Sequence, residues 1–200
     1  MSFHHKLIIM GNLKDLILKN RSYRRFYQNI EISEETLHEL VDLARLSPSA
    51  KNAQSIKYII SNTPENNSKI FPSLGWAGYL KDWDGPEEGE RPSAYLIMLN
   101  DSRISENYLC DDGIFAQSIL LGAVEKELAG CIIASVSRAK LQQELNIPDY
   151  FKIIQVIALG KAKETIVLED MKDDDFKYWR DNKCVHHVPK RSLNELIVKI

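Results

Sequence analysis

Residues 33–47 have the pattern of an amphipathic helix. A polar motif precedes this segment and another follows it, so the length of the helix sets the distance between the two motifs. Ser33 is a natural helix N-cap, and Glu34 and Glu35 favour the positive end of a helix. The apolar residues that follow are spaced as on one buried helix face: Leu37, Leu40, Val41 and Ala44. Pro48 ends the pattern, because the residue before a proline is pushed away from helical angles. The segments on either side therefore stand about one helix apart.

The motif before this helix is cationic and carries a hydroxyl group. Arg21, Ser22 and Arg24 lie close together in a run that ends at Phe26. Guanidinium groups bind phosphate bidentately, and a serine hydroxyl supplies a further donor. These residues are candidates for a phosphate site, and the alternative is a solvated basic turn.

The motif after the helix is polar and rich in small residues. Its candidate site residues are Pro48, Ser49, Asn52 and Gln54. Asn and Gln side chains offer donors and acceptors together, which suits the edge of a ring that alternates carbonyl and N–H groups. Alone, this motif indicates an ordinary loop. Together with the first motif, it suits the two ends of a flat, phosphorylated cofactor.

A third candidate site lies near the end of the chain. Lys190 and Arg191 precede a capping box formed by Ser192 and Glu195, and cations beside a helix N-terminus favour anion binding. The alternative is a basic flank on an exposed helix. An apolar stripe follows and predicts a helix that docks on its own core or on a partner subunit: Leu193, Leu196, Ile197 and Ile200.

Composition narrows the class of protein. A chain of 200 residues fits one domain, residues 1–200, and a formal net charge of -2 gives no global reason to expect nucleic acid or an anionic membrane as a partner. Cys110, Cys131 and Cys184 are odd in number and widely spaced, which disfavours disulfides and zinc and fits a reducing cytoplasm. The apolar run before Met10 is too short for a signal peptide.

The remaining pattern mixes helices and strands without a regular βαβ rhythm, which predicts an α+β fold with a sheet covered by helices. Expected strands lie at 58–60, 94–99, 131–136 and 153–159. Expected helices lie at 13–17, 71–80, 114–124 and 137–145. The helix at 114–124 is the central one, and Gly130 is expected to follow its end. A turn is expected at 62–67. No G-x-G-x-x-G or G-x-x-x-x-G-K-[ST] motif occurs, which disfavours a Rossmann domain and an NTPase phosphate loop.

In order and spacing, these features resemble the nitroreductase family over nearly the whole chain. The matching landmarks are Arg21-Ser22-x-Arg24, residues 44–54, the helix at 112–130, the strand ending at Gly160, and the pair Lys190-Arg191. The resemblance implies a central, mostly antiparallel sheet flanked by helices, and an intertwined homodimer whose C-terminal segments wrap the partner.

It also implies that FMN is the cofactor and assigns roles to the candidate residues. Arg21 and Ser22 would contact the FMN phosphate, joined by Lys190 or Arg191. Arg24 would lie nearer the ring and the ribityl chain, where a cation stabilises negative charge on the flavin.

For the flavin ring, the resemblance implies contributions from both subunits. Asn52 would bond the flavin edge, and three neighbours would line the site: Pro48, Ser49 and Gln54. Backbone groups near Ile133 and Ala134 would face the reactive side of the ring. The sequence departs from the family pattern at Ser55, where proline is frequent, and at Gly160 to Glu164.

The implied activity is the transfer of electrons from NADH or NADPH to a nitroaromatic, quinone or related conjugated acceptor, in a ping-pong cycle. The cofactor carries the electrons, so no side-chain acid or base is required. The alternatives are another flavin reaction such as dehalogenation or oxidation, a flavin-binding protein without turnover, and a helical interaction module that binds no flavin.

Two further groups are ambiguous in the sequence. Trp76, Tyr79 and Trp83 either line the acceptor pocket by stacking or pack in the core. His186 and His187 are adjacent, so their side chains point in different directions, and no acidic or Cys partner sits at ligand spacing. No metal site is therefore expected.

Overall fold

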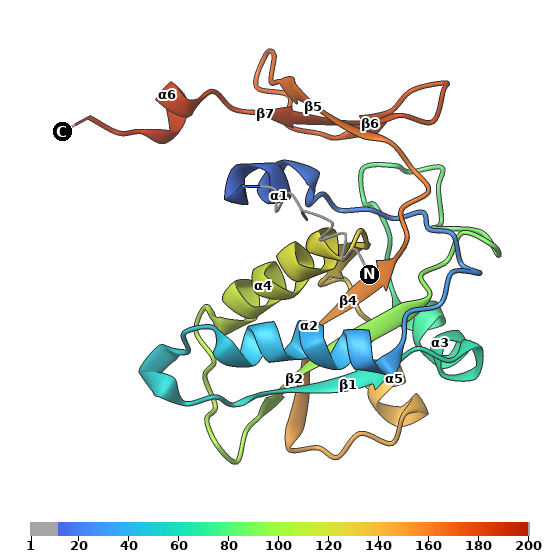
Figure 1. Cartoon of the computed structure of the whole chain (residues 1–200), viewed down its shortest axis with the longest axis vertical. Helices are drawn as coiled ribbons and strands as arrows, with labels where there is room; N and C mark the ends of the chain where they lie inside the picture. Colours follow the sequence, from blue (N-terminus) through green and yellow to red (C-terminus); the bar gives the residue numbers. More distant parts are fainter. Residues whose placement is uncertain (1–11, 200) are drawn as a thin grey trace, which may run out of the picture.

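A four-stranded antiparallel sheet forms the centre of the molecule, with strand order β1-β2-β4-β3 (Figure 1). The structure is a computed structural model that describes residues 12–199. The strands are β1 (Ile56–Ser61), β2 (Ala94–Asp101), β4 (Phe151–Gly160) and β3 (Ala129–Ile133). The inner pair, β2 and β4, carries almost continuous apolar sequence because both of its faces are covered by helices.

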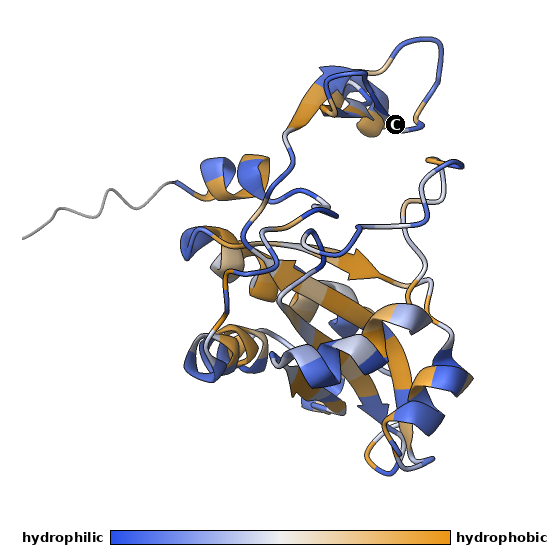
Figure 2. Cartoon of the chain, turned by 90° about the vertical axis from the view of Figure 1, so that its right-hand side faces the viewer, coloured by the Kyte–Doolittle hydropathy of each residue, from blue (hydrophilic) through white to orange (hydrophobic). Residues whose placement is uncertain are grey.

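Alternation along β2 divides the core into two layers, since successive strand residues face opposite sides of a sheet. Leu96 and Met98 pack with α2 (Glu34–Leu46) and α4 (Asp111–Glu125). Tyr95 and Ile97 pack on the other face, where α3 (Pro64–Ile70) and α5 (Arg138–Glu144) contribute Ile70 and Leu141. Figure 2 shows the apolar strands enclosed between these helices.

A second, small sheet lies above the central one in Figure 1, next to α1 (Leu13–Lys19). It consists of β5 (Ile166–Asp170), β7 (His186–Lys190) and β6 (Trp179–Arg180), in the order β5-β7-β6. The β5–β7 pair is parallel and the β6–β7 pair is antiparallel. After β7 the chain leads away from the core through α6 (Leu193–Leu196) (Figure 1).

The α+β fold with an antiparallel sheet flanked by helices, as predicted from the sequence, is confirmed. The first long helix begins as expected, because Ser33 Oγ accepts a hydrogen bond from the Thr36 amide at 3.1 Å. Its apolar face is buried through Leu37, Leu40 and Ala44. Within residues 12–199, no helix has the length and apolarity needed to cross a membrane.

Two local predictions are wrong between residues 62 and 80. The expected turn at 62–67 contains the start of α3, because Thr63 caps the helix and Pro64 occupies its first position, where its missing N–H costs nothing. The expected helix at 71–80 is only a 3-10 turn, Phe71–Ser73. After it the chain extends, and the Gly75 amide donates to Ser135 O at 2.7 Å.

The predictions for the ends of two helices also need correction. Gly130 does not follow the central helix but lies in β3. A side chain there has no room, because an added Cβ would lie 2.5 Å from Leu120 Cδ2 and 2.7 Å from Ala158 O. The terminal helix has its capping box at Ser192 but ends at Leu196, and Ile200 lies outside the described residues. Strands β5, β6 and β7 were not predicted, because none exceeds five residues and the apolar run of β5, Ile166 to Leu168, is only three residues long.

Replacing Gly130 by alanine is expected to destabilise the fold. The new methyl group would meet the backbone carbonyl of Ala158, which cannot move aside, so Gly130→Ala should lower the free energy of unfolding by about 1–3 kcal/mol. Gly113 on α4 is the matched control, because a Cβ there meets nothing within 4 Å. Gly113→Ala should raise stability by roughly 0.5–1 kcal/mol. Urea unfolding of both variants checks this, and equal effects would contradict it.

Candidate functional site

The cationic motif runs beside the edge strand β3. Ser22 forms a parallel bridge with Gly130, and the Tyr23 amide donates to Gly130 O at 3.0 Å. The next amide, that of Arg24, donates to the Glu164 carboxylate, whose residue is only 9% exposed. Backbone contacts on both sides of the motif therefore fix where its side chains project.

These side chains, with those of the second sheet, surround a cavity of about 270 Å³. Its lining residues come from the motif, α4, β3 and β7: Asn20, Arg21, Ser22, Arg24, Gln117, Leu120, Gly130, Ile132, Tyr178, His186, Val188 and Lys190. Three of them are cationic, and none of these lining residues is a carboxylate. Such a set attracts an anion, and Arg residues in particular bind phosphate.

Arg21 is held in place with donor capacity left over. Its Nη2 donates to Ile17 O at 2.7 Å, near the end of α1. Its Nε is buried and has no hydrogen-bond partner within the described chain. Buried donors are normally paired. An unpaired guanidinium N–H at a cationic cavity therefore fits a site that binds a phosphate group, as FMN carries.

The polar loop lies elsewhere, at the far end of α2 from this motif (Figure 1). Ser49 Oγ donates to Asp111 Oδ2 at 2.7 Å, and the Ala50 amide donates to Asp111 Oδ1 at 2.8 Å. Asp111 begins α4 and is buried. Pro48, Ser49, Asn52 and Gln54 do not line the cationic cavity. Within one chain, the structure does not bring the two motifs together.

The backbone of this loop is unusual. Around the 3-10 turn Ala50–Asn52, three non-glycine residues take a left-handed φ of 53°: Lys51, Asn52 and Gln54. Such angles are costly for residues with a side chain and persist where the surroundings impose them. The buried Asp111 carboxylate anchors the start of the loop at Ser49 and Ala50, and Ser49 Oγ accepts a hydrogen bond from the Gln54 amide at 3.1 Å. Asp111 was not predicted, because its partners lie 62 and 61 residues away along the chain.

The other predicted site residues are divided between the cavity and its surroundings. Lys190 lines the cavity, whereas Arg191 Nη1 pairs with Asp174 Oδ1 at 2.7 Å and Glu195 Oε1 at 3.2 Å. In β3 the cavity is lined by Gly130 and Ile132. Ile133 points into the core, and Ala134 O accepts a bond from Arg138.

A buried cluster behind Arg24 was not predicted. The Glu164 carboxylate that binds the Arg24 amide also accepts from Arg180 Nη2 at 3.1 Å. His186 Nε2 lies 3.3 Å from Arg24 Nη1, and the Arg24 guanidinium lies 4.7 Å from the Tyr178 ring centroid. Burial, and then the charges of Arg24, Arg180 and His187, lower the pKa of His186 to about 4. No sequence motif indicates this cluster, because its C-terminal members lie on and beside strands that were not predicted.

The three aromatic residues whose role was left open have different neighbours. Tyr79 meets the Tyr178 ring edge-on, with centroids 4.9 Å apart, and Trp83 lies under Arg180 at 4.6 Å. Trp76 instead packs against Phe71 at 5.8 Å. Tyr79 and Trp83 therefore support the cluster beside the cavity, and Tyr178 is the aromatic residue that lines it.

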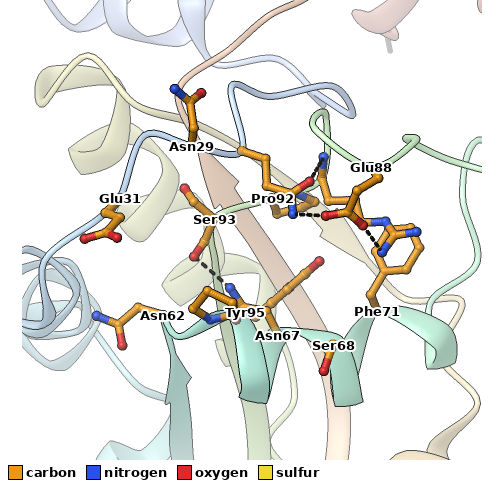
Figure 3. A pocket seen from close by; sticks show the side chains of 13 residues that line it. Asn29, Glu31, Asn62, Asn67, Ser68, Phe71, Glu88, Pro92, Ser93 and Tyr95 are labelled. Carbon is orange, nitrogen blue, oxygen red and sulfur yellow. Dashed lines mark hydrogen bonds and ion pairs between the residues drawn. The ribbon is translucent and has the colours of Figure 1, made fainter.

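A second cavity, of about 260 Å³, lies between α3 and the start of β2 (Figure 3). Its polar side chains mostly bond one another. Arg91 Nη1 pairs with Glu88 Oε2 at 2.6 Å, Gln28 Nε2 donates to Glu88 Oε1 at 2.7 Å, and Asn67 Nδ2 donates to Ser93 O at 2.8 Å. Because its one cation is paired, this cavity lacks the free positive charge of the first. Residues 12–199 contain no cluster of three or more His, Cys, Asp or Glu able to hold a metal ion.

Comparison with known proteins agrees with this geometry. The model of the nitroreductase family matches residues 17–161. A Bacillus subtilis protein named "Putative NAD(P)H nitroreductase YodC" is 24% identical over 183 residues, covering 76% of this chain and 91% of the relative.

Two solved structures share the fold. An FMN-dependent nitroreductase from Clostridium difficile R20291 aligns with a TM-score of 0.60 and 21% identity, over 84% of this chain and 97% of the other. The enone reductase CLA-ER of gut-bacterial fatty acid saturation aligns with a TM-score of 0.67 and 18% identity, over 83% and 96%. Because the family model covers well over half of the chain, this protein belongs to the nitroreductase family.

Proposed function

We propose that this protein is an FMN-dependent oxidoreductase that passes electrons from NADH or NADPH to a conjugated acceptor such as a nitroaromatic or a quinone. The observation that carries the proposal is the cavity where Arg21, Arg24 and Lys190 converge beside Gly130. Family membership supports the redox chemistry, and the cationic cavity supports a phosphorylated cofactor.

The FMN phosphate would bind at the end of the cavity formed by Arg21, Ser22 and Lys190. Guanidinium and ammonium groups make charge-assisted hydrogen bonds to phosphate, and the buried Arg21 Nε is available as a donor. Arg191 would join them only after leaving its carboxylate partners, Asp174 and Glu195. Gly130 also lines the cavity, and its carbonyl oxygen holds the motif in place by accepting the hydrogen bond from the Tyr23 amide.

When bound, FMN supplies the chemistry by accepting a hydride from the nicotinamide and returning electrons to the acceptor. The residues of the chain orient the cofactor and stabilise charge. Arg24 would lie near the ring, where a fixed cation favours the negative charge that gathers on its pyrimidine side. Backbone groups near Ile133 and Ala134 would face the reactive side, and Tyr178 offers an aromatic surface for a flat acceptor.

We further propose a homodimer in which the loop of the partner subunit completes the site. A single chain keeps Asn52 and Gln54 away from the cationic cavity, so a second copy is needed to supply the flavin-edge contacts. Large apolar side chains near the C-terminus support such a partner, with exposures of 71% for Leu193, 66% for Leu196 and 85% for Val198. Exposed apolar groups clustered in this way are typical of subunit interfaces.

A surface that fits these side chains lies beside the edge strand β1. It is a groove of about 420 Å³ between α2 and β1, whose apolar lining includes Val41, Ile56, Ile60 and Phe115. The outer edge of β1 has no neighbouring strand among the described residues. We propose that the C-terminal segment of the second copy covers this groove, since an open sheet edge favours pairing with another chain.

Two alternative functions are compatible with the same fold. One is other flavin chemistry, such as dehalogenation or oxidation, and the other is flavin binding without turnover. Steady-state kinetics separates them. The proposal requires oxidation of NAD(P)H that depends on added acceptor, whereas a binding protein would take up FMN without such turnover.

Replacing Arg21 by alanine should weaken FMN binding by about 1.5–3 kcal/mol, which is the range for a hydrogen bond to a charged group. Lys69→Ala is the control, because Lys69 is a cation on α3 that pairs with Glu65 outside the cavity. Quenching of flavin fluorescence measures both dissociation constants. An unchanged constant for Arg21→Ala would contradict the phosphate assignment.

Introducing charge near the C-terminus should separate the subunits. Leu196 and Val198 are exposed in one chain, so Leu196→Asp with Val198→Asp should leave the monomer fold intact yet place two carboxylates in an apolar interface. Light scattering after gel filtration should show a monomer with impaired FMN binding. Lys14→Asp, on the exposed surface of α1, controls for added negative charge. If the double variant stays dimeric, the proposed interface is wrong.

A further inference from the structure

His186 is fixed in the middle strand of the small sheet, with its ring directed at Arg24. The residue is 1% exposed, and its backbone pairs with Ile166 on β5 and Arg180 on β6. Its amide also donates to Thr165 O at 2.9 Å. With neighbours on both sides of the strand, the imidazole has little freedom to move.

The contact between the two side chains defines the state of the imidazole. Arg24 Nη1 lies 3.3 Å from His186 Nε2. A guanidinium carries only donors, so the histidine nitrogen must be the acceptor. His186 is then uncharged, and its proton resides on Nδ1 (a tautomer assigned from the contact).

The surroundings keep the imidazole uncharged. Burial, followed by the charges of Arg24, Arg180 and His187, lowers the pKa of His186. The other group that faces it is the Tyr178 ring, at 5.1 Å between centroids. The nearest carboxylate of the cluster, Glu164, is engaged by Arg180 and by the Arg24 amide. At neutral pH, His186 therefore stays uncharged, and its Nε2 accepts the hydrogen bond from Arg24 Nη1.

This arrangement is unfavourable for the stability of the fold. His186 Nδ1 is buried and has no hydrogen-bond partner in the described chain. The ring also lies close to two guanidinium groups. An apolar side chain of similar size would leave no buried nitrogen unpaired and would not place a basic ring beside two cations. Unfavourable arrangements of this kind occur most often at functional sites.

We propose that His186 is a positioning residue, which holds the Arg24 guanidinium at the cavity wall by accepting its hydrogen bond. Tyr178 stacks on the guanidinium, and Ser22 O accepts a bond from the same Nη1 at 3.1 Å. The inference rests on the proposed function, in which Arg24 stabilises charge on bound FMN. Without His186, the guanidinium loses an anchor and its stabilisation of reduced flavin weakens, because electrostatic stabilisation depends on preorganised groups.

The first test is the midpoint potential of the FMN-loaded protein in three variants. His186→Leu removes the acceptor, and we expect the reduced flavin to lose stability relative to the oxidised form by about tenfold, which is about 30 mV for a two-electron couple. His186→Gln returns an acceptor and should restore much of the potential. His187→Leu is the matched control on the same strand, because His187 stacks on Trp179 instead of contacting Arg24.

A double variant shows whether His186 acts through Arg24. If it does, adding His186→Leu to Arg24→Gln should change the potential no further, because the two residues form one unit. Titration of His186→Leu with oxidised FMN shows separately whether flavin still binds through the phosphate contacts of Arg21 and Lys190, so that the potential is compared only between loaded proteins.

A second measurement needs no flavin. Nitrogen chemical shifts of the imidazole, measured by NMR on the protein without FMN, should show the Nδ1–H tautomer of His186 in the parent protein. Arg24→Gln should raise the pKa of His186, because it removes an adjacent positive charge, while His187 should change less. This readout also serves if His186→Leu fails to fold.

The outcomes separate the two proposals. Normal flavin binding with an unchanged potential in His186→Leu would overturn the positioning role and leave the proposed function standing. An Nε2–H or protonated imidazole in the parent would overturn it as well. Protein that takes up no FMN would overturn the proposed function, and the role of His186 toward flavin with it.

Discussion

The backbone contact between the cationic motif and β3 is the constraint on which the site depends. The amide of Tyr23 reaches Gly130 O, and it does so at a place where any Cβ would collide with Leu120 and Ala158. Gly130 therefore lets β3 pack tightly on Leu120 and Ala158, and the strand held in this way offers the basic segment a backbone partner. Because of this contact, the side chains of Arg21 and Arg24 face the cationic cavity.

A second set of contacts gives that group its geometry. The Glu164 carboxylate holds the Arg24 backbone, while His186 on β7 and Tyr178, just before β6, contact its side chain. The cavity thus depends on segments from both halves of the chain. In the proposed dimer it would also depend on the partner, whose strained loop at residues 49–54 is shaped by Asp111. Such preorganised polar groups are what a cofactor site requires.

The sequence predicted what local patterns encode and missed what long-range contacts decide. The capped helix, the apolar strands and the convergence of Arg21, Ser22, Arg24 and Lys190 on one cavity followed from patterns and from a family resemblance. Strands β5 to β7 have five residues or fewer each, which is too short for periodicity to indicate them. The observed roles of Asp111, Glu164 and His186 were not predicted, because each contacts residues far away in sequence and burial cannot be seen in the sequence.

The proposed function depends above all on the binding of the FMN phosphate in the cationic cavity. It is tested most directly by titrating the protein with FMN and with riboflavin, which lacks the phosphate, and following flavin fluorescence at several salt concentrations. We expect FMN to bind at least about tenfold more tightly, as charge-assisted hydrogen bonds to phosphate require, with the difference shrinking as salt rises. Equal affinity for the two flavins, or binding of neither, would contradict the claim.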